Sequence, residues 1–181
     1  MTGEMVEVML REGNCLDAHD IAVVHVASWQ TTYRNIMPAT FLDQLAVEPR
    51  ERYWASLLCS DPRFDPLHIM IVAEEQGRVV GFATGGPERS GKYPYLGELY
   101  ALYLLEAYQR QGIGRQLVTQ VAQRLAQRDM KSMLVWVLTE NPSREFYAHL
   151  GGEPVGSQLV TIGGESYEEI GYGWKDVSTM I

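Results

Sequence analysis

Two glycines, Gly112 and Gly114, stand where one regular segment of the sequence gives way to another. The apolar run GELYALYLL at 97–105 is typical of a buried strand, and a helical periodicity begins at Ile113. The apolar face of this helix comprises Ile113, Leu117, Val118, Val121 and Leu125. Each glycine costs a helix about 0.5–1 kcal/mol relative to alanine. The segment therefore predicts a strand, a glycine loop and a helix, in which the backbone either bends sharply or is approached closely by a ligand.

Strand and helix patterns on both sides of this unit indicate the rest of the fold. We expect strands at 6–10, 67–75, 77–86, 97–105, 131–139, 152–162 and 165–174, with turns at Gln76-Gly77 and Gly163-Gly164. Helices are expected at 15–33, 50–58, from 113 onward and at 141–150, with a short helix after Pro38 and a loop at 61–66. Pro49 suits a first helical position, and Asn141 suits a helix cap. This order predicts one α+β domain over residues 1–181 with a single central sheet.

Acidic residues outnumber basic ones, since 23 Asp and Glu against 15 Lys and Arg give a formal net charge of -8. This balance argues against nucleic acid as the main partner, because phosphate contacts require a basic surface. It favours a neutral or cationic small molecule as substrate.

The cysteines and histidines show no pattern of a disulfide scaffold or a metal site. Cys15 and Cys59 lie far apart and outside any C-x-x-C spacing, which favours two reduced thiols in an intracellular protein. The four histidines are scattered, so we expect no metal. The N-terminus lacks a basic signal-peptide region, and no apolar run approaches the roughly 18–20 residues of a membrane-spanning helix. We therefore expect a cytoplasmic protein with no membrane partner.

The glycine loop is suited to binding an anion. A strand, a short polar loop and a helix N-terminus together supply free backbone N–H groups and the positive end of a helix dipole. Arg110 and Arg115 add positive charge for phosphates. A dinucleotide fingerprint is excluded because Leu117 stands where a third glycine is required, and no Lys-Ser/Thr pair follows as in a P-loop. The spacing alone leaves open the alternative that the glycines only form a tight turn before a packed helix.

The segment ELYALYLLEAYQRQGIGRQL at 98–117, followed by an Asn-Pro-led helix that contains Tyr147, resembles the coenzyme A site of the GNAT superfamily of N-acetyltransferases. The order of elements resembles that family over nearly the whole chain. The resemblance implies a mixed, mostly antiparallel sheet of about six to seven strands flanked by helices. The family's pyrophosphate-binding loop, Gln/Arg-x-x-Gly-x-Gly/Ala, corresponds to residues 109–114. Glu106, where proline is common, and Leu104, where valine is frequent, depart from the family pattern.

The resemblance implies acetyl-CoA as the cosubstrate and assigns two groups of contacts to it. Backbone groups at Leu102, Tyr103 and Leu104 would bind the pantetheine arm, assisted by Asn141 and Ser143. The implied contacts to the phosphates are Gln109, Arg110, Gln111, Gly112, Ile113, Gly114 and Arg115.

The resemblance also implies an acyltransferase that moves an acetyl group directly to a primary amine of a small molecule or peptide. Such a transfer requires a deprotonated amine, a stabilised oxyanion and a proton for the departing thiolate. Tyr147 corresponds to the family's general acid, and an ordinary tyrosine pKa of about 10 suits that role. The backbone N–H of Leu104 is the expected oxyanion donor. Composition alone would make Tyr147 a packing residue beside Phe146 and Leu150.

Glu98 is the expected general base. On a regular strand it shares a face with Tyr100 and Leu102, and many family members carry a glutamate at this place, facing the acceptor. Its carboxylate would act through a water molecule or hold a cationic amine, and the alternative is a surface glutamate at a strand start. His25, a lone histidine in an apolar helical stripe, is expected to be a core residue.

The aromatic segment WQTTYRNIMPATFLDQL at 29–45 resembles the helix–loop–helix over the acceptor cleft of these enzymes. The expected acceptor contacts are Trp29, Tyr33, Glu98 and Tyr100, with Met37 and Phe41 as further walls. The alternative is that the aromatic residues belong to the core, which is their commoner fate.

A second function fits the same sequence, namely a non-catalytic module of this fold that senses acyl-CoA. Such a module would keep the glycine loop but would need neither Tyr147 nor Glu98, so the presence of both favours an enzyme. The sequence does not specify the acceptor beyond a small-molecule amine or a peptide, and it is compatible with a homodimer.

Overall fold

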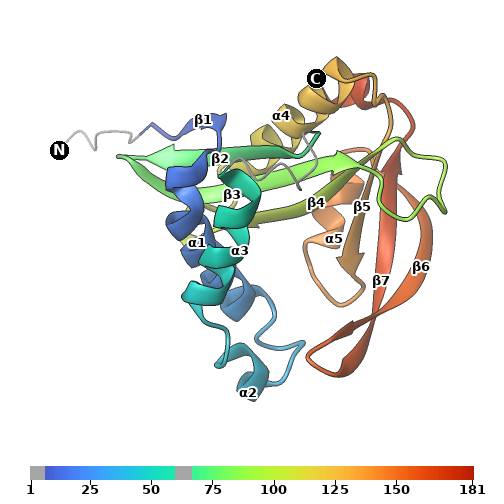
Figure 1. Ribbon diagram of the computed structural model, residues 1–181. Helices are drawn as coiled ribbons and strands as arrows, with labels where there is room; N and C mark the ends of the chain where they lie inside the picture. Colours follow the sequence, from blue (N-terminus) through green and yellow to red (C-terminus); the bar gives the residue numbers. More distant parts are fainter. Residues whose placement is uncertain (1–6, 60–66) are drawn as a thin grey trace.

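A seven-stranded mixed sheet forms the centre of the computed structural model, which describes residues 7–59 and 67–181 (Figure 1). The strands follow the order β1-β2-β3-β4-β5-β7-β6. Their bounds are β1 Met9–Glu12, β2 Ile69–Glu75, β3 Arg78–Pro87, β4 Gly97–Leu104, β5 Met133–Leu138, β6 Glu153–Ile162 and β7 Glu165–Trp174. Neighbouring strands pair antiparallel except β4 and β5, which are parallel. The expected α+β class with a mostly antiparallel sheet is confirmed.

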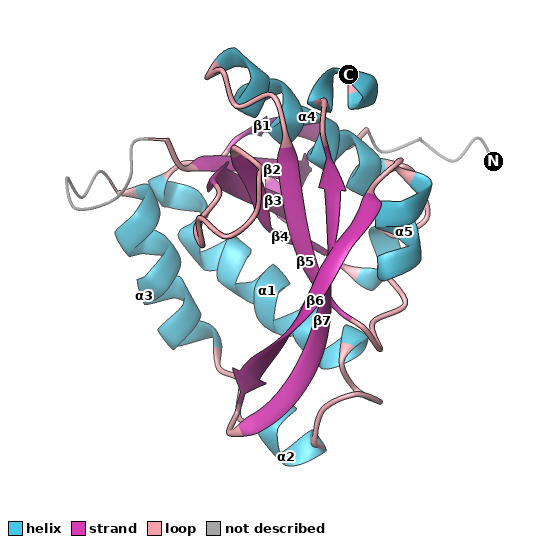
Figure 2. Cartoon of the chain, turned by 90° about the vertical axis from the view of Figure 1, so that its right-hand side faces the viewer, coloured by secondary structure: helices cyan, strands magenta, loops and turns pink. Residues whose placement is uncertain are grey.

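Helices cover both faces of this sheet. Their bounds are α1 Ala18–Thr32, α2 Ala39–Leu42, α3 Val47–Leu58, α4 Ile113–Gln127 and α5 Arg144–His149. Figure 1 shows α1 and α3 side by side on one face, and Figure 2 shows α5 across the strands from them. The second face also carries α4, which contacts β2, β3 and β4. Within the described ranges, no helix is long and apolar enough to cross a membrane.

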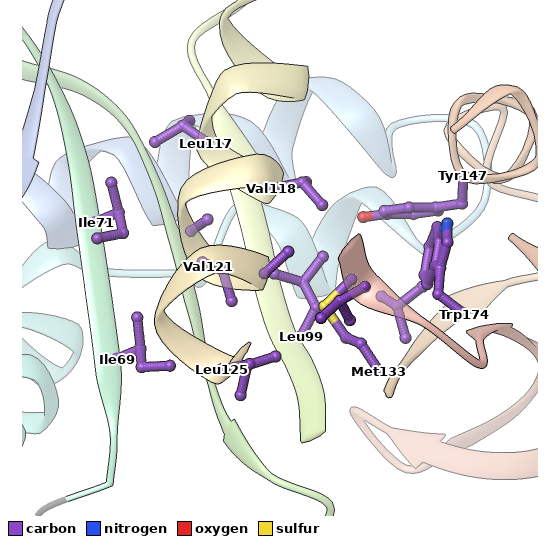
Figure 3. Packing of buried hydrophobic residues seen from close by; sticks show 14 of the residues in the cluster. Ile69, Ile71, Leu99, Leu117, Val118, Val121, Leu125, Met133, Tyr147 and Trp174 are labelled. Carbon is purple, nitrogen blue, oxygen red and sulfur yellow. The ribbon is translucent and has the colours of Figure 1, made fainter. Parts of the chain in front are cut away.

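Two apolar clusters fix the helices to the sheet. The face of α4 predicted from the sequence is buried against β2, β4 and β5 (Figure 3). On the other face, α1 and α3 bury Ile21, Val24 and Trp54 against Phe82 of β3. Each buried aliphatic side chain contributes about 1.5–3 kcal/mol of transfer free energy, so this packing holds the start of α4 in place beside the sheet.

The β3–β4 ladder contains a bulge that changes which way the side chains of β4 point. Thr84 pairs with Ala101 and Gly85 with Leu99, so the register shifts by one extra residue of β4, Tyr100. Leu99 and Leu102 both contact the α4-side cluster, although a regular strand would place them on opposite faces. The expectation that Glu98 shares a face with Leu102 is therefore wrong, because the extra residue inverts the alternation.

Several element boundaries differ from those expected. β1 begins at Met9, while residues 1–6 and the expected loop at 61–66 lie outside the described residues. α3 begins at Val47, so Pro49 lies in its first turn but not at its first position. The two predicted hairpin turns are confirmed, with positive φ at Gln76, Gly77, Gly163 and Gly164.

Cys15 and Cys59 form a disulfide, so the expectation of two reduced thiols is wrong. Because α1 and α3 pack against each other, the turn before α1 lies next to the residue that follows α3. The two Cα atoms are 4.7 Å apart although the residues are separated by 44 positions in the sequence. Spacing rules such as C-x-x-C detect only local pairs, so the sequence offered no signal for this one.

The disulfide is expected to raise the free energy of unfolding by about 4 kcal/mol, because it closes a long loop in the unfolded chain. Urea unfolding with and without dithiothreitol measures this difference. The double variant Cys15→Ser/Cys59→Ser is the control, since reductant should leave its stability unchanged. Two titratable thiols in the denatured, unreduced protein would contradict the pairing.

Candidate active site

The glycine loop forms a left-handed bend at the start of α4. Arg110 and Gly112 have φ angles of 61° and 83°, a region in which glycine is unstrained. The side chain of Gln109 braces the bend by donating to the carbonyl oxygen of Leu104 at 3.0 Å. Gln111 likewise donates, at 2.9 Å, to a carbonyl oxygen in the preceding turn. The two glutamine side chains therefore hold the loop in shape, and the amides between them remain available.

The backbone amides from residue 110 to residue 115 have no hydrogen-bond acceptor among the residues described. The next amide, that of Gln116, donates to the carbonyl oxygen of Gly112 at 3.1 Å. A Cβ at Gly112 would meet nothing within 4 Å, so open space lies beside these amides. Arg110 and Arg115 are exposed at the same place. Free N–H groups, a helix N-terminus and two guanidinium groups together favour the binding of an anion.

Gly112 and Gly114 differ in what their positions require of a residue. The positive φ of Gly112 accounts for glycine at that position. A Cβ at Gly114 would make ordinary contacts with Phe146 at 3.6 Å and with Leu102 at 3.9 Å. Packing against the described chain therefore does not demand glycine at 114. A glycine here does leave the backbone open to close approach by a ligand.

β4 and β5 separate where the loop meets the sheet. They pair only over Gly97–Leu99 and Met133–Val135. Beyond that point β4 stays bonded to β3, and β5 is bonded to β7 up to Leu138. Over residues 101–104 the edge of β4 on the β5 side is consequently not paired with β5. An extended ligand can hydrogen-bond to such an edge as another strand would.

Tyr147 of α5 is buried close to these separated strands. Its side chain is 6% exposed, and its ring contacts those of Phe146 and Tyr172. Figure 3 shows the hydroxyl directed toward α4, near Val118. Burial, reinforced by Tyr103, raises the pKa of Tyr147 well above its ordinary value of 10.0. The hydroxyl therefore stays protonated across the usual pH range, and the expectation of an ordinary pKa is wrong.

The turn before α5 places Asn141 beside a second buried tyrosine. Asn141 Oδ1 accepts a hydrogen bond from the Ser143 amide at 2.9 Å, and the helix starts after this turn rather than at 141. The Asn141 side chain also bonds the hydroxyl of Tyr33. Burial raises the pKa of Tyr33, and the neighbouring hydroxyls of Tyr103 and Tyr147 raise it further. Three tyrosine hydroxyls, from the residue that follows α1, from β4 and from α5, thus lie close together where the strands separate.

The side chain of Tyr103 is directed toward α1. Its hydroxyl accepts a hydrogen bond from Trp29 Nε1 at 2.9 Å, and its ring stacks on His25 with centroids 4.8 Å apart. His25 Nδ1 accepts from Trp54 Nε1 at 3.2 Å. Burial, assisted by the charge of Arg50, lowers the pKa of His25 to about 3. His25 is therefore a neutral, buried residue, as expected.

Glu98 is buried in an ion pair that the sequence did not predict. Its side chain accepts from Arg89 Nη2 at 2.5 Å, from Arg89 Nε at 3.2 Å and from the Arg89 amide at 3.1 Å. The guanidinium also lies 4.3 Å from the centre of the Tyr100 ring. Both carboxylate oxygens are therefore occupied while the pair is intact. Arg89 lies in an irregular segment between β3 and β4, where no periodicity marks it.

The expected acceptor-binding aromatics lie at the C-terminal end of α1 and in α2. Trp29 and Tyr33 contact edge to face with ring centroids 4.9 Å apart, and Phe41 lies beside Trp29. These three side chains pack partly exposed against a small cluster that includes Met37 and Leu138 of β5. Met37 itself is a buried core residue.

A cavity of about 250 Å³ opens between α2 and the turn that joins β6 to β7. Its lining residues are Pro38, Thr40, Phe41, Gln44, Ile162, Gly163, Glu165 and Tyr167. Sequence reasoning named Phe41 but none of the residues from the β6–β7 hairpin. They are separated from α2 by most of the chain, so only the fold brings them to one place.

The arrangement as a whole combines an anion-binding loop, an unpaired strand edge and a buried proton donor. Among residues 7–59 and 67–181, no three His, Cys, Asp or Glu side chains are grouped so as to hold a metal ion. An extended donor molecule that carries phosphates at one end fits the loop and the strand edge together. Transfer of a group from such a donor is the chemistry that this geometry favours.

Sequence comparison finds a matching family model and a similar protein, and both are described as acetyltransferases. Residues 28–152 match the family model described as acetyltransferase (GNAT) family. The chain is 42% identical over 173 residues to the uncharacterized N-acetyltransferase YuaI of Bacillus subtilis, and the match covers 96% of each sequence.

Structure comparison finds the same fold. A GCN5-related N-acetyltransferase from Rhodopseudomonas palustris superimposes with a TM-score of 0.71 at 22% identity, covering 94% of this chain and 98% of that one. The putative acetyltransferase YncA from Salmonella typhimurium, solved with acetyl-CoA, gives 0.66 at 18% identity and 93% coverage of both chains.

Proposed function

Because the chain belongs to the GNAT acetyltransferase family, we propose that it transfers an acetyl group from acetyl-CoA directly to a primary amine of a small molecule or peptide. The observation that carries this proposal is the row of unpaired amides at 110–115, next to the unpaired edge of β4. A pyrophosphate fits the amides, and a pantetheine arm fits the strand edge. The presence of acetyl-CoA in the YncA structure supports the choice of donor.

In this proposal the loop binds the pyrophosphate through its backbone, while Arg110 and Arg115 attract the outlying phosphates. Gln109 and Gln111 contribute by bracing the loop. The predicted contacts to the pantetheine arm remain the backbone at 102–104, together with Asn141 and Ser143.

The transfer itself begins when the amine nitrogen attacks the carbonyl carbon of the thioester. The backbone N–H of Leu104 stabilises the oxyanion, as predicted from the family resemblance. The bond between carbon and sulfur then breaks, its electron pair leaves with the sulfur, and the Tyr147 hydroxyl protonates the thiolate. The high pKa of Tyr147 supports this role, because the hydroxyl still holds its proton at the moment of transfer. The proton lost by the amine passes to a carboxylate or to water.

Glu98 can accept the proton of the amine only when the Arg89 guanidinium has moved away from it. The guanidinium side chain is 62% exposed, so it can swing into solvent, whereas the Glu98 side chain is 4% exposed and cannot. An arriving acceptor that displaces Arg89 would free both carboxylate oxygens. We therefore propose the Arg89–Glu98 pair as the resting form of the base.

Three further predictions from the sequence stay proposals. One domain over residues 1–181 is supported by the single sheet to which strands from both ends of the described chain belong. A homodimer and a cytoplasmic location stay predictions from the sequence, and the Cys15–Cys59 disulfide argues against the second, because disulfides are rare in cytosolic proteins. The alternative of a non-catalytic acyl-CoA sensor would be favoured if the protein bound acetyl-CoA but acetylated no amine in a broad panel.

Acetyl-CoA is expected to stabilise the protein by about 2.7 kcal/mol at a hundredfold excess over its dissociation constant. The variant Gly112→Asp should lose this shift in melting temperature, because its carboxylate would face the pyrophosphate. Gly112→Ala is the matched control, since it carries the same backbone strain without the charge. If acetyl-CoA raised the melting temperature of Gly112→Asp as much as that of wild type, the loop would not be the binding site.

The variant Tyr147→Phe is expected to separate catalysis from binding. Its ring still packs beside Phe146 and Tyr172, so stability and acetyl-CoA affinity should change little. The acetylation rate constant should fall by about 10²–10⁴-fold, which is the usual contribution of a general acid. Because burial raises the pKa of Tyr147, the wild-type rate should not decline through pH 9–10 on account of this group. Turnover within about twofold of wild type in single-turnover measurements would make Tyr147 a packing residue.

The variant Glu98→Gln should lower turnover most at low pH, where the amine is hardest to deprotonate, and leave acetyl-CoA affinity nearly unchanged. Arg89→Gln is the variant to compare with it, because it removes the guanidinium and leaves the Glu98 carboxylate in place. If Glu98 is the base, Arg89→Gln retains turnover that Glu98→Gln loses. Equal losses in the two variants would mean that the pair has a structural role only.

A further inference from the structure

One face of β7 carries alternating acidic and aromatic side chains. Ile170 and Tyr172 belong to the cluster on the α4 side. Because side chains alternate along a strand, those at odd-numbered positions of β7 point to the α1 side. These are Glu165, Tyr167 and Glu169. Figure 2 shows α1 and α5 on opposite sides of the β5–β7 pair, so this face of β7 lies across the strands from Tyr147.

The cavity between α2 and the β6–β7 turn lies on this same face. Glu165 and Tyr167 line it from β7, and Phe41 lines it from α2. Glu169 is the next residue along the same face, opposite Leu138 of β5. The cavity therefore has aromatic walls and one carboxylate, with a second carboxylate two positions along the strand.

Glu169 connects the cavity to the centre of the candidate active site. Leu138, its partner in the ladder, packs in the cluster that Tyr33 also contacts. The charge of Glu169 is among the influences that raise the pKa of Tyr33, after burial and the neighbouring tyrosines. Tyr33 in turn bonds Asn141, at the turn that leads into α5. A molecule in the cavity can thus extend past Glu169 toward the place where β4 and β5 separate.

The carboxylates on this face form no ion pair with a residue that the structure describes. Glu169 Oε1 accepts from the neutral amide of Gln158 at 2.8 Å, and no ion pair of the described residues includes Glu165 or Glu169. Residues 153–174 contain four glutamates and no Lys, Arg or His. Glu98, by contrast, is neutralised by Arg89. A partly buried carboxylate without a counter-ion favours a ligand that supplies the positive charge.

Building on the proposed function, we propose that this cavity and Glu169 form a subsite for a second, cationic group of the acceptor. The reacting amine must be neutral when it attacks, so the charge bound here belongs to another part of the molecule. Aromatic walls suit an ammonium group as well, through cation–π contacts with Tyr167 and Phe41. The acceptor class is therefore a diamine or polyamine, with one nitrogen acetylated and another held at the β7 face.

Three probes of equal chain length test this subsite, namely 1,4-diaminobutane, 1-aminobutane and 4-aminobutanoate. Wild-type kcat/KM is expected to be highest for the diamine and lowest for the amino acid. Glu169→Gln should lower kcat/KM for the diamine by about 10- to 100-fold, mainly through KM, which is the range of a hydrogen bond to a charged group. The value for 1-aminobutane should change little.

Glu168→Gln is the matched control, because it removes the same charge from an adjacent, exposed position on the other face of the strand. It should leave the preference among the probes unchanged. Calorimetric titration of 1,4-diaminobutane into the protein saturated with coenzyme A gives a readout that does not depend on turnover.

Equal kcat/KM for the three probes, or a Glu169→Gln variant that keeps the wild-type preference, would overturn the subsite. The same conclusion follows if wild type neither acetylates nor binds the diamine in preference to the other two. Such results would leave the proposed acetyl transfer standing as long as acetyl-CoA binding still depends on Gly112. Loss of that dependence would overturn the proposed function instead.

Discussion

The parallel pairing of β4 with β5 ends at Leu99 and Val135, and the candidate active site depends on that ending. A continued ladder would satisfy the backbone groups of residues 100–104, and no extended ligand could bind to them. The bulge at Thr84 and Gly85 accompanies the separation and turns Leu102 toward the α4 side. Because α4 is packed on β2, β3 and β4, the amides of the glycine loop are held beside the free strand edge. Tyr147, the proposed proton donor, belongs to the same apolar cluster, so its position is fixed by the same packing.

Charge is distributed so that different parts of the site suit different ligands. The loop at the start of α4 offers amides and two exposed arginines, which suit the phosphates of a donor. The β7 face offers carboxylates that form no ion pair within the described part of the chain, which suits a cation. The tyrosine hydroxyls near the separated strands have pKa values raised by burial, and Glu98 is neutralised by Arg89. Opposite charges at separate places would direct a donor and an acceptor to different sides of the same sheet.

The disulfide and the buried histidine stabilise the helices on the side of the sheet where we propose that the acceptor binds. Cys15 and Cys59 join the start of α1 to the end of α3, and His25 of α1 bonds Trp54 of α3. The neutral state of His25 follows from its burial, and it permits stacking on Tyr103 in the apolar interior. These contacts tie together the two helices that cover one face of β4, so Tyr103 and Trp29 have fixed positions above the separated strands.

The sequence by itself determined the features that depend on neighbouring residues. Periodicity predicted the buried face of α4, turn residues predicted both hairpins, and Gly-x-Gly before a helix predicted a loop whose amides are left without an acceptor in the described chain. Only the tertiary structure decided which distant residues meet. Arg89 pairs with Glu98, Cys15 is bonded to Cys59, and Glu165 and Phe41 line one cavity, and no local pattern connects the segments involved. The bulge in β4 likewise depends on the register with β3, and a single extra residue was enough to move Leu102 to the other face of the sheet.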